Sequence, residues 1–170
     1  MHETDQELAT LQTLLNDSIE RAGPHLRSMF RSPMDATEVV SALSGILEVH
    51  FATVTPSGAP FVAPIDALFY RGQLWIGIPS KALRRAFVQR ERRVSISYTR
   101  GTSFCLIIHG TAEAVGSDDP LVEQYERFSD GLYVQQYGED WLDWAAKQKA
   151  EGNDGDLWRI RARRMFVKDQ

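Results

Sequence analysis

The spacing of hydrophobic residues along this chain changes from three or four to two near residue 46. Before that point leucine and isoleucine recur at helical intervals, at Leu8, Leu11, Leu15 and Ile19. This pattern predicts an amphipathic helix over 4–21, which opens with the capping-box sequence Thr-Asp-Gln-Glu and stops before Gly-Pro. A loop is expected next, and then a short helix around 35–44 with Asp35 near its start.

From residue 46 onward, apolar and polar residues alternate, which is the pattern of strands with one buried face. The expected strands lie at 46–51, 61–70, 74–78, 93–98 and 103–115. Turn-rich sequences such as TPSGAP and RGQ separate the first three, so these strands are expected to form hairpins. A helix over 81–90 separates the third strand from the fourth, and this connection is expected to cross the sheet.

The last part of the chain returns to helical patterns before one final strand. Asp119-Pro120 has the form of an N-cap followed by proline at the first helical position, and helices are expected at 120–129 and 139–150. The sequence LWRIRARRMFV, at 157–167, alternates apolar residues with arginine as a strand does.

The order of these elements predicts a mainly β protein with peripheral helices. Short consecutive strands joined by tight turns favour a six-stranded antiparallel barrel over a parallel, doubly wound sheet. We expect one domain over 1–170, whose parts are an N-terminal helical extension (1–45), barrel strands (46–115), a helical insertion (117–150) and a final strand (156–168).

Composition restricts the partners and the cellular location that are expected for this domain. The chain has 170 residues, a hydrophobic fraction of 43% and a net charge of −4, so a general attraction to nucleic acid or anionic membranes is not expected. Cys105 is the single cysteine, which excludes an intramolecular disulfide. No apolar run reaches the roughly 20 residues of a membrane helix, and the N-terminus lacks the pattern of a signal peptide. A cytoplasmic location is therefore expected.

A basic stretch stands out against this acidic background. Residues 81–93 contain six lysines and arginines but only one acid, Glu91. One interpretation is a solvated helix that turns Leu83, Ala86 and Phe87 inward. The other is a phosphate site at the helix N-terminus, where Ser80 would cap the helix and the cations would bind phosphate oxygens.

The strand sequence VAPID, at 62–66, carries a proline that removes one backbone N–H from the ladder. Pro64 could simply protect an exposed strand edge. Alternatively, the interrupted ladder leaves neighbouring backbone groups free to bind a flat ligand. The sequence shows no metal-ligand spacing, phosphate loop, nucleophile elbow or other catalytic constellation, so no metal is expected and no catalytic residue is assigned.

Residues 46–115 resemble the pyridoxamine 5'-phosphate oxidase-like family of split-barrel flavoproteins. The resemblance rests on the order of ATVTPSGAP, VAP, GQLWIGIPS, RRVSI and HGTAEAV. It implies a homodimer with flavin sites at the subunit interface. It also implies that strand two lies beside the flavin ring and that the end of strand three and the next helix hold the phosphate. The ring-side residues would be Val62, Ala63, Pro64 and Ile65, and the phosphate-side residues would be Ile78, Pro79, Ser80, Lys81, Arg84 and Arg85.

The resemblance implies a flavin-dependent oxidoreductase that transfers hydride between bound FMN and a small-molecule substrate. The same family includes users of a deazaflavin coenzyme and relatives that bind haem, so a deazaflavin-dependent reductase and a non-catalytic flavin- or haem-binding protein are alternatives. The sequence departs from the family at Arg92, where proline is common before RVS. The C-terminal arginine–histidine pattern of true pyridoxamine 5'-phosphate oxidases is not recognisable, so pyridoxamine phosphate is not the expected substrate.

Overall fold

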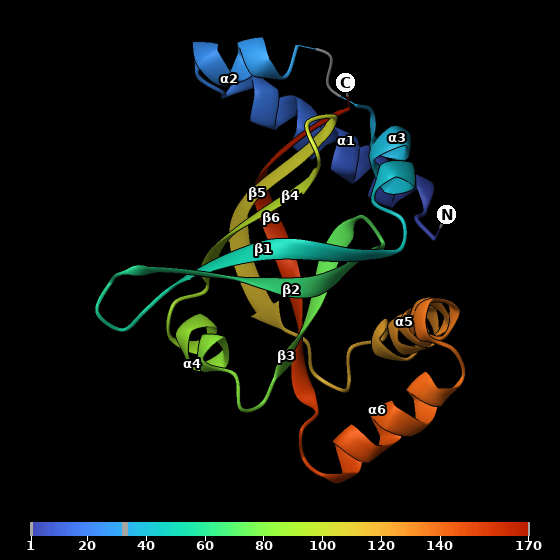
Figure 1. Cartoon of the computed structure of the whole chain (residues 1–170). Coiled ribbons are helices and arrows are strands. Elements are labelled where there is room, and N and C mark those ends of the chain that lie inside the picture. Colours follow the sequence, from blue (N-terminus) through green and yellow to red (C-terminus); the bar gives the residue numbers. More distant parts are fainter. Residues whose placement is uncertain (1, 32–33, 170) are drawn as a thin grey trace.

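The six strands of the chain close into an antiparallel barrel in the order β1-β2-β3-β6-β5-β4 (Figure 1). A computed structural model describes residues 2–31 and 34–169. The strands are β1 (Ile46–Val54), β2 (Pro60–Tyr70), β3 (Gln73–Pro79), β4 (Arg93–Arg100), β5 (Phe104–Ala114) and β6 (Gly155–Asp169). This architecture confirms the predicted six-stranded barrel.

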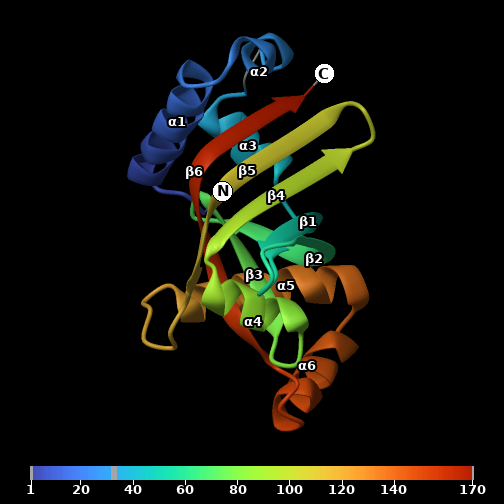
Figure 2. The same ribbon diagram turned by 90° about the vertical axis from the view of Figure 1, so that its left-hand side faces the viewer.

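Six helices surround the barrel within the described residues. They are α1 (Asp5–Glu20), α2 (Pro24–Met29), α3 (Ala36–Ala42), α4 (Leu83–Arg90), α5 (Val122–Tyr137) and α6 (Asp140–Ala150). The first three gather at one end of the barrel, whereas α4 and the α5–α6 pair lie toward the other end (Figures 1 and 2). None of the helices in the described ranges has the length and hydropathy needed to cross a bilayer.

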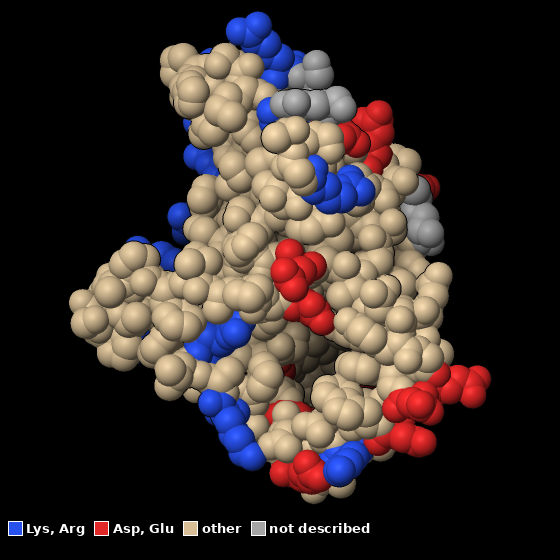
Figure 3. Space-filling view, in the orientation of Figure 1, with Lys and Arg blue, Asp and Glu red and all other residues tan. Residues whose placement is uncertain are grey.

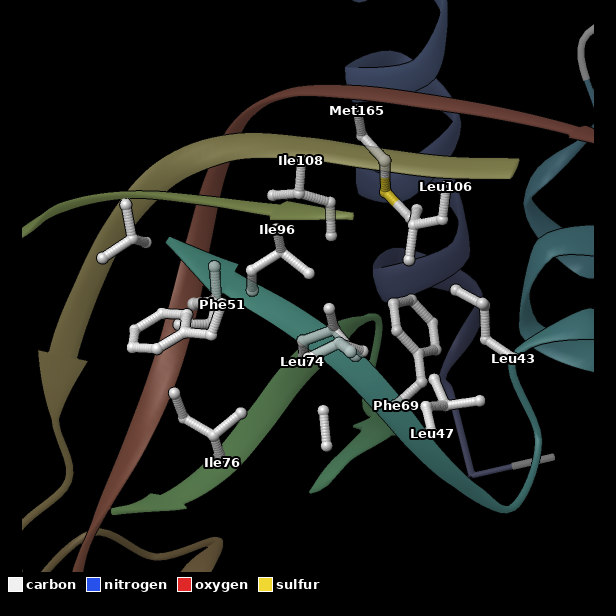
Figure 4. Packing of buried hydrophobic residues seen from close by; sticks show 14 of the residues in the cluster. Leu43, Leu47, Phe51, Phe69, Leu74, Ile76, Ile96, Leu106, Ile108 and Met165 are labelled. Carbon is white, nitrogen blue, oxygen red and sulfur yellow. The ribbon is translucent and has the colours of Figure 1, made fainter. Parts of the chain in front are cut away.

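The barrel interior is a continuous apolar core. Alternate residues of each strand point inward, and Phe51, Ile76, Ile96, Leu106 and Ile108 are each 2% exposed or less (Figure 4). This is the inward face that the period-two pattern predicts. The barrel closes through a short pairing of β1 with β4 at residues 50–52 and 95–97, and β2 and β3 also pair over only part of their length.

The predicted capping box at Thr4 and the predicted helix start near Asp35 are both confirmed. Thr4 and Asp35 are the N-caps of α1 and α3, and each forms a complete capping box with the glutamate three residues later. The Arg71 guanidinium also bonds Glu7 Oε1 at 2.7 Å, which fixes the start of α1 to the β2–β3 turn. In this way α1 is held over one end of the barrel.

The outer face of β2 and β3 is covered by α5. The Trp75 and Tyr125 rings stack at 4.7 Å, and Tyr70 and Phe128 stack at 4.8 Å. These rings form a second apolar cluster outside the barrel together with Leu68. The helical insertion is therefore packed onto the sheet directly beside the divergence of β2 and β3.

Several sequence predictions for the helices were wrong in detail. Gly23-Pro24 ends α1 but also begins α2, because proline suits the first helical position, and this segment had been expected to be a loop. α5 extends well beyond the predicted 120–129, and its N-cap is Leu121 where Asp119 was expected. Asp119 instead accepts the Leu121 N–H at 2.9 Å and pairs with Arg159 at 3.2 Å.

Candidate functional site

The two strands β2 and β3 pair over only part of their length. Residues 67–70 of β2 pair with 73–76 of β3, after which β3 follows β6. Residues 60–66 of β2 stay paired with β1 but have no strand on their other edge. Backbone N–H and C=O groups on that edge are free to bind something other than a strand.

The predicted ring-side residues lie along this open edge. Val62 is 62% exposed and Pro64 is also exposed, whereas Ala63 and Ile65 are half-buried. Successive backbone groups of a strand alternate in direction, so the groups of residues 62 and 66 point to the same edge as those of Pro64. A ligand at the VAPID segment can therefore contact both the exposed side chains of Val62 and Pro64 and the unpaired backbone groups of the strand.

Helix α4 runs past this edge, and Arg84 connects the two. Its Nη1 donates a hydrogen bond of 2.8 Å to the Pro64 carbonyl oxygen. Burial lowers the pKa of the Arg84 guanidinium, and no carboxylate of the described residues pairs with it. Arg84 is therefore a half-buried cation whose hydrogen-bond partner is a neutral carbonyl, and its guanidinium is suited to binding an anion.

Lys81 lies in the turn before α4 and also lacks an acidic partner among the described residues. Its Nζ donates to Asn153 Oδ1 at 2.6 Å, so the ammonium group is positioned by a neutral amide. Ser80 is held by the same loop, because its Oγ donates to the Gly152 carbonyl at 3.1 Å. The loop between α6 and β6 thus fixes the residues that follow β3.

The structure corrects two expectations for this basic helix. Ser80 does not cap it, because α4 begins only at Leu83 with Ala82 as an N-cap that makes no side-chain hydrogen bond. Nor does the helix turn Leu83 and Ala86 inward: Leu83 is 71% exposed, and Val88 is the fully buried residue. Phe87 is half-buried against Phe61, with ring centroids 5.4 Å apart.

Two of the predicted phosphate-side residues offer little to a bound phosphate: the charge of Arg85 is neutralised by a carboxylate, and the side chain of Ile78 points into the core. Arg85 forms a salt bridge of 2.6 Å with Asp156, and this hydrogen bond raises the pKa of the Arg85 guanidinium. Ile78 is fully buried in the barrel core, so only its backbone can face a ligand. Of the predicted phosphate-side cations, Lys81 and Arg84 are therefore the two whose hydrogen-bond partners are neutral.

A cavity of about 620 Å³ lies between β2–β3, the α5–α6 pair and the start of β6. Pro79, Ser80 and Lys81 line it, as do Asp66 and Leu68 from β2. Figure 3 shows a hollow in this part of the surface, with acidic side chains near its rim. The cavity is within the usual size of small-molecule sites and adjoins the open edge of β2.

Aromatic residues from α5 and α6 form the far wall of this cavity. The rings of Tyr133 and Trp141 stack with centroids 4.3 Å apart, and Trp144 lies beside Trp141 at 4.8 Å. Sequence analysis did not assign these residues to a site. A signal was present, since Tyr133, Tyr137, Trp141 and Trp144 follow one another at spacings of three and four.

Tyr133 links this aromatic wall to β2. Its hydroxyl donates to Asp66 Oδ2 at 3.3 Å, and burial together with the Asp66 charge raises the pKa of Tyr133. The phenol therefore keeps its proton at neutral pH. Asp66, which lines the cavity, stands opposite Glu48 of β1 in the strand register, so two carboxylates are cross-strand neighbours here.

Two histidines and the cysteine of the barrel strands lie outside this cavity. His50 and His109 are exposed on β1 and β5, and Cys105 is half-buried near the start of β5. Across residues 2–31 and 34–169, no group of three His, Cys, Asp or Glu side chains is arranged to hold a metal ion.

Comparison with known proteins identifies the fold. Neither models of protein families nor curated proteins match the chain. A conserved hypothetical protein from Mycobacterium tuberculosis is similar in structure, with a TM-score of 0.63 and 22% identity over 80% of this chain and 85% of that one. HutZ, the haem storage protein from Vibrio cholerae, has a TM-score of 0.58 and 19% identity over 78% and 91% of the two chains.

A third similar structure connects the fold to the family noted from sequence. It is a Listeria innocua protein provisionally described as a pyridoxamine 5'-phosphate oxidase, with a TM-score of 0.52 and 13% identity over 76% of this chain and 92% of that one. The chain thus has the split-barrel fold of flavin- and haem-binding proteins. More particularly, it has the fold of pyridoxamine 5'-phosphate oxidase-like proteins, as its sequence motifs indicated.

Proposed function

We propose that this chain is a flavin-dependent oxidoreductase that binds FMN or a deazaflavin along the open edge of β2. The observation that carries the proposal is the pair of cations Lys81 and Arg84, which flank that edge with only neutral hydrogen-bond partners among the described residues. A phosphate group between or beside them would supply the missing negative charge. Pro79 and Ser80 complete the phosphate side of the site.

The ring of such a cofactor would lie against Val62, Ala63, Pro64 and Ile65. The free backbone groups of this strand suit a flat heteroaromatic ring that has donors and acceptors on its rim. A bound flavin or deazaflavin supplies hydride transfer, and the protein supplies binding, orientation and electrostatics.

Haem is the less favoured cofactor. The cavity next to the open edge has no His, Cys or Met among its lining residues in the described part of the chain. Haem iron is most often held by one of these side chains, and of the less common axial ligands the described lining offers Tyr125 and Tyr133. The two unpaired cations suit a phosphorylated cofactor better.

The substrate is proposed to occupy the aromatic cavity. Tyr133, Trp141 and Trp144 offer ring faces and edges, whereas Asp66 and Glu126 bring negative charge. This combination favours a flat small molecule that is neutral or cationic. The Tyr133 hydroxyl donates its proton to Asp66, so it offers the substrate an oxygen that can accept a hydrogen bond.

A second copy of the chain is proposed to complete the site. Val62 and Leu83 are 62% and 71% exposed, and they stand on β2 and α4 at the open edge. Large apolar side chains so placed indicate a covered surface. A homodimer formed here would shield the flavin ring from water and bring residues of the partner subunit to it.

The test is a titration of the purified protein with FMN, followed by flavin fluorescence. We expect saturable binding, and about a tenfold or greater loss of affinity when Lys81 or Arg84 is replaced by alanine, because each provides a charged hydrogen bond. Arg92→Ala is the control, since Arg92 is exposed at the other end of the basic stretch. Protein that takes up neither FMN nor a deazaflavin would refute the proposal.

Turnover requires a separate measurement. A carrier would hold the flavin in one redox state, whereas an enzyme would be bleached by NAD(P)H or another hydride donor and reoxidised by its substrate. Anaerobic reduction followed by addition of planar neutral or cationic acceptors would distinguish the two.

A further inference from the structure

The pairing of β5 with β6 contains a bulge that changes the direction of two arginines. His109 pairs with Arg164, but the next residue, Gly110, pairs with Ala162, so Arg163 is an additional residue of β6 without a partner. Neighbouring residues of a regular strand point to opposite faces. At this bulge the rule is broken, and Arg163 and Arg164 both line one cavity on the outside of the barrel.

Gly110 is what allows the bulge. A Cβ atom at this position would overlap the Arg161 carbonyl group, so the two backbones approach more closely than any other residue permits. The position of both arginine side chains thus depends on a glycine in the facing strand.

The cavity has a volume of about 610 Å³ and lies on the outer face of β4, β5 and β6, next to the end of α1. Figure 2 looks onto these three strands, with α1 beside β6. Its polar lining consists of Arg21, Arg93, Ser95, His109, Arg163 and Arg164. No acidic and no aromatic side chain other than His109 belongs to the described lining.

The positive charge of this cavity is only partly compensated. Arg93 pairs with Glu91 at 2.7 Å, and this hydrogen bond lowers the pKa of Glu91 to about 2. Arg21 pairs with Asp17 at 3.4 Å in an exposed i, i+4 bridge. Neither Arg163 nor Arg164 has a carboxylate partner among residues 2–31 and 34–169.

Arg164 is the most informative of these side chains. Its Nη1 is buried and forms no hydrogen bond within the described structure. A buried guanidinium N–H without an acceptor is unfavourable by more than an ordinary lost hydrogen bond. His109 stands next to it in register, and its Nδ1 is hydrogen-bonded to Ser95 Oγ at 2.8 Å, which leaves Nε2 for another partner.

We propose that this cavity is a second anion site, which binds the diphosphate group of a small molecule. Two or more arginine forks and a histidine match the several oxygens of a diphosphate better than they match a single carboxylate. Since no flat apolar ring lines the cavity, recognition is directed at the phosphate groups and not at an attached base. None of its lining residues belongs to the proposed flavin and substrate sites.

The proposal is tested by calorimetric titration of the full chain with inorganic pyrophosphate. We expect saturable binding that weakens with salt, and about a tenfold or greater loss of affinity in Arg163→Gln and in Arg164→Gln. Arg161→Gln is the matched control. It removes the same charge from the same strand, but Arg161 is bonded to Glu113 and lies outside the cavity.

Three results would overturn the proposal. The first is no binding of pyrophosphate, and the second is an equal loss in Arg161→Gln, which would indicate general charge attraction. The third is loss of pyrophosphate binding in the Lys81→Ala, Arg84→Ala double variant, which would place the anion in the flavin site. In protein that binds FMN, an excess of FMN that leaves pyrophosphate affinity unchanged would support two separate sites. If the protein binds no flavin, pyrophosphate binding that is lost in the Arg163 and Arg164 variants and kept in the Lys81, Arg84 double variant still supports this site.

A second copy of the chain could instead supply the anion. Sedimentation of wild type and Arg164→Gln decides this point. An unchanged oligomeric state alongside weakened pyrophosphate binding supports the proposal. Dissociation of an oligomer by the substitution, with no pyrophosphate binding by wild type, would assign the arginines to a subunit interface and refute it.

Discussion

The Arg84 guanidinium donates a 2.8 Å hydrogen bond to the carbonyl oxygen of Pro64. This contact joins α4 to the part of β2 that has no neighbouring strand, so a side chain takes the place of a strand partner. It also connects the two sequence motifs, VAPID and the basic stretch, for each of which a ligand site was one of two interpretations of the sequence.

Replacing Arg84 by alanine therefore has an effect even without a cofactor. We expect the free energy of unfolding to fall by about 1 kcal/mol, because the Pro64 carbonyl loses its partner. Arg84→Lys should keep the charge but lose the planar fork, and should lie between alanine and wild type in FMN affinity. Urea denaturation and fluorescence titration measure the two effects. Equal FMN affinities of Arg84→Ala and wild type would contradict the phosphate assignment.

The proposed subunit contact at the open edge can be tested through Val62 and Leu83. Val62→Asp places a charge where an apolar contact with a second copy is expected, and should shift the protein from dimer to monomer in sedimentation. Leu83→Glu should do the same. The exposed Leu142 of α6 is the control position, and Leu142→Glu is expected to leave the dimer intact. A wild-type protein that is monomeric at all concentrations would rule out this contact.

The buried phenol of Tyr125 and the half-buried phenol of Tyr133 predict a loss of stability in alkali. Burial raises the pKa of Tyr125 and of Tyr133 above the usual value of 10.0. The folded chain then holds protons that the unfolded chain releases above about pH 10, so the free energy of unfolding falls as the pH rises past that value. Tyr133→Phe should flatten this decline in urea denaturation measured between pH 8 and 11, about the range that brackets the free phenol pKa. An unchanged slope would mean that Tyr133 titrates normally.

Two glycines should respond to alanine in opposite ways. At Gly110 the new Cβ would overlap the Arg161 carbonyl, so Gly110→Ala should be strongly destabilising or disrupt the bulge. Gly131 lies within α5 with open space around it, and Gly131→Ala should stabilise the chain by roughly 0.5–1 kcal/mol. Thermal unfolding of both variants gives the comparison. Stability of Gly110→Ala equal to wild type would show that the β5–β6 pairing does not need glycine.

The barrel was predictable because alternation and turn residues are local signals. Each strand could be located from its own sequence, as could the capping boxes at Thr4 and Asp35. The buried face of α4 was not predictable, because Val88 is inward only by virtue of how the helix crosses from β3 to β4. The start of α4 at Leu83 was not predictable either, because it also depends on the path of the chain from β3 to β4, and Ser80 is therefore not the N-cap.

For the candidate site, too, the local sequence motifs were predictable, whereas the contacts between residues far apart in the chain were not. The VAPID strand and the basic stretch could be recognised in sequence, but their connection by Arg84 could not. Lys81 meets Asn153 and Arg85 meets Asp156, partners about seventy residues away that only the closed barrel brings together. The aromatic wall follows a helical repeat that is visible in sequence, yet nothing in that repeat shows which strand it faces.

The chain between β5 and β6 leaves the barrel and returns to the same place. Ala114 pairs with Trp158, and the Val115 N–H bonds the Leu157 carbonyl at 2.8 Å, so the two ends of the α5–α6 segment are held side by side. The free energy needed to close such a loop depends only weakly on its length. The wall of the substrate cavity could thus be lengthened, shortened or exchanged while the barrel and the edge of β2 stay unchanged. The binding preference of this fold can therefore change in evolution independently of its core.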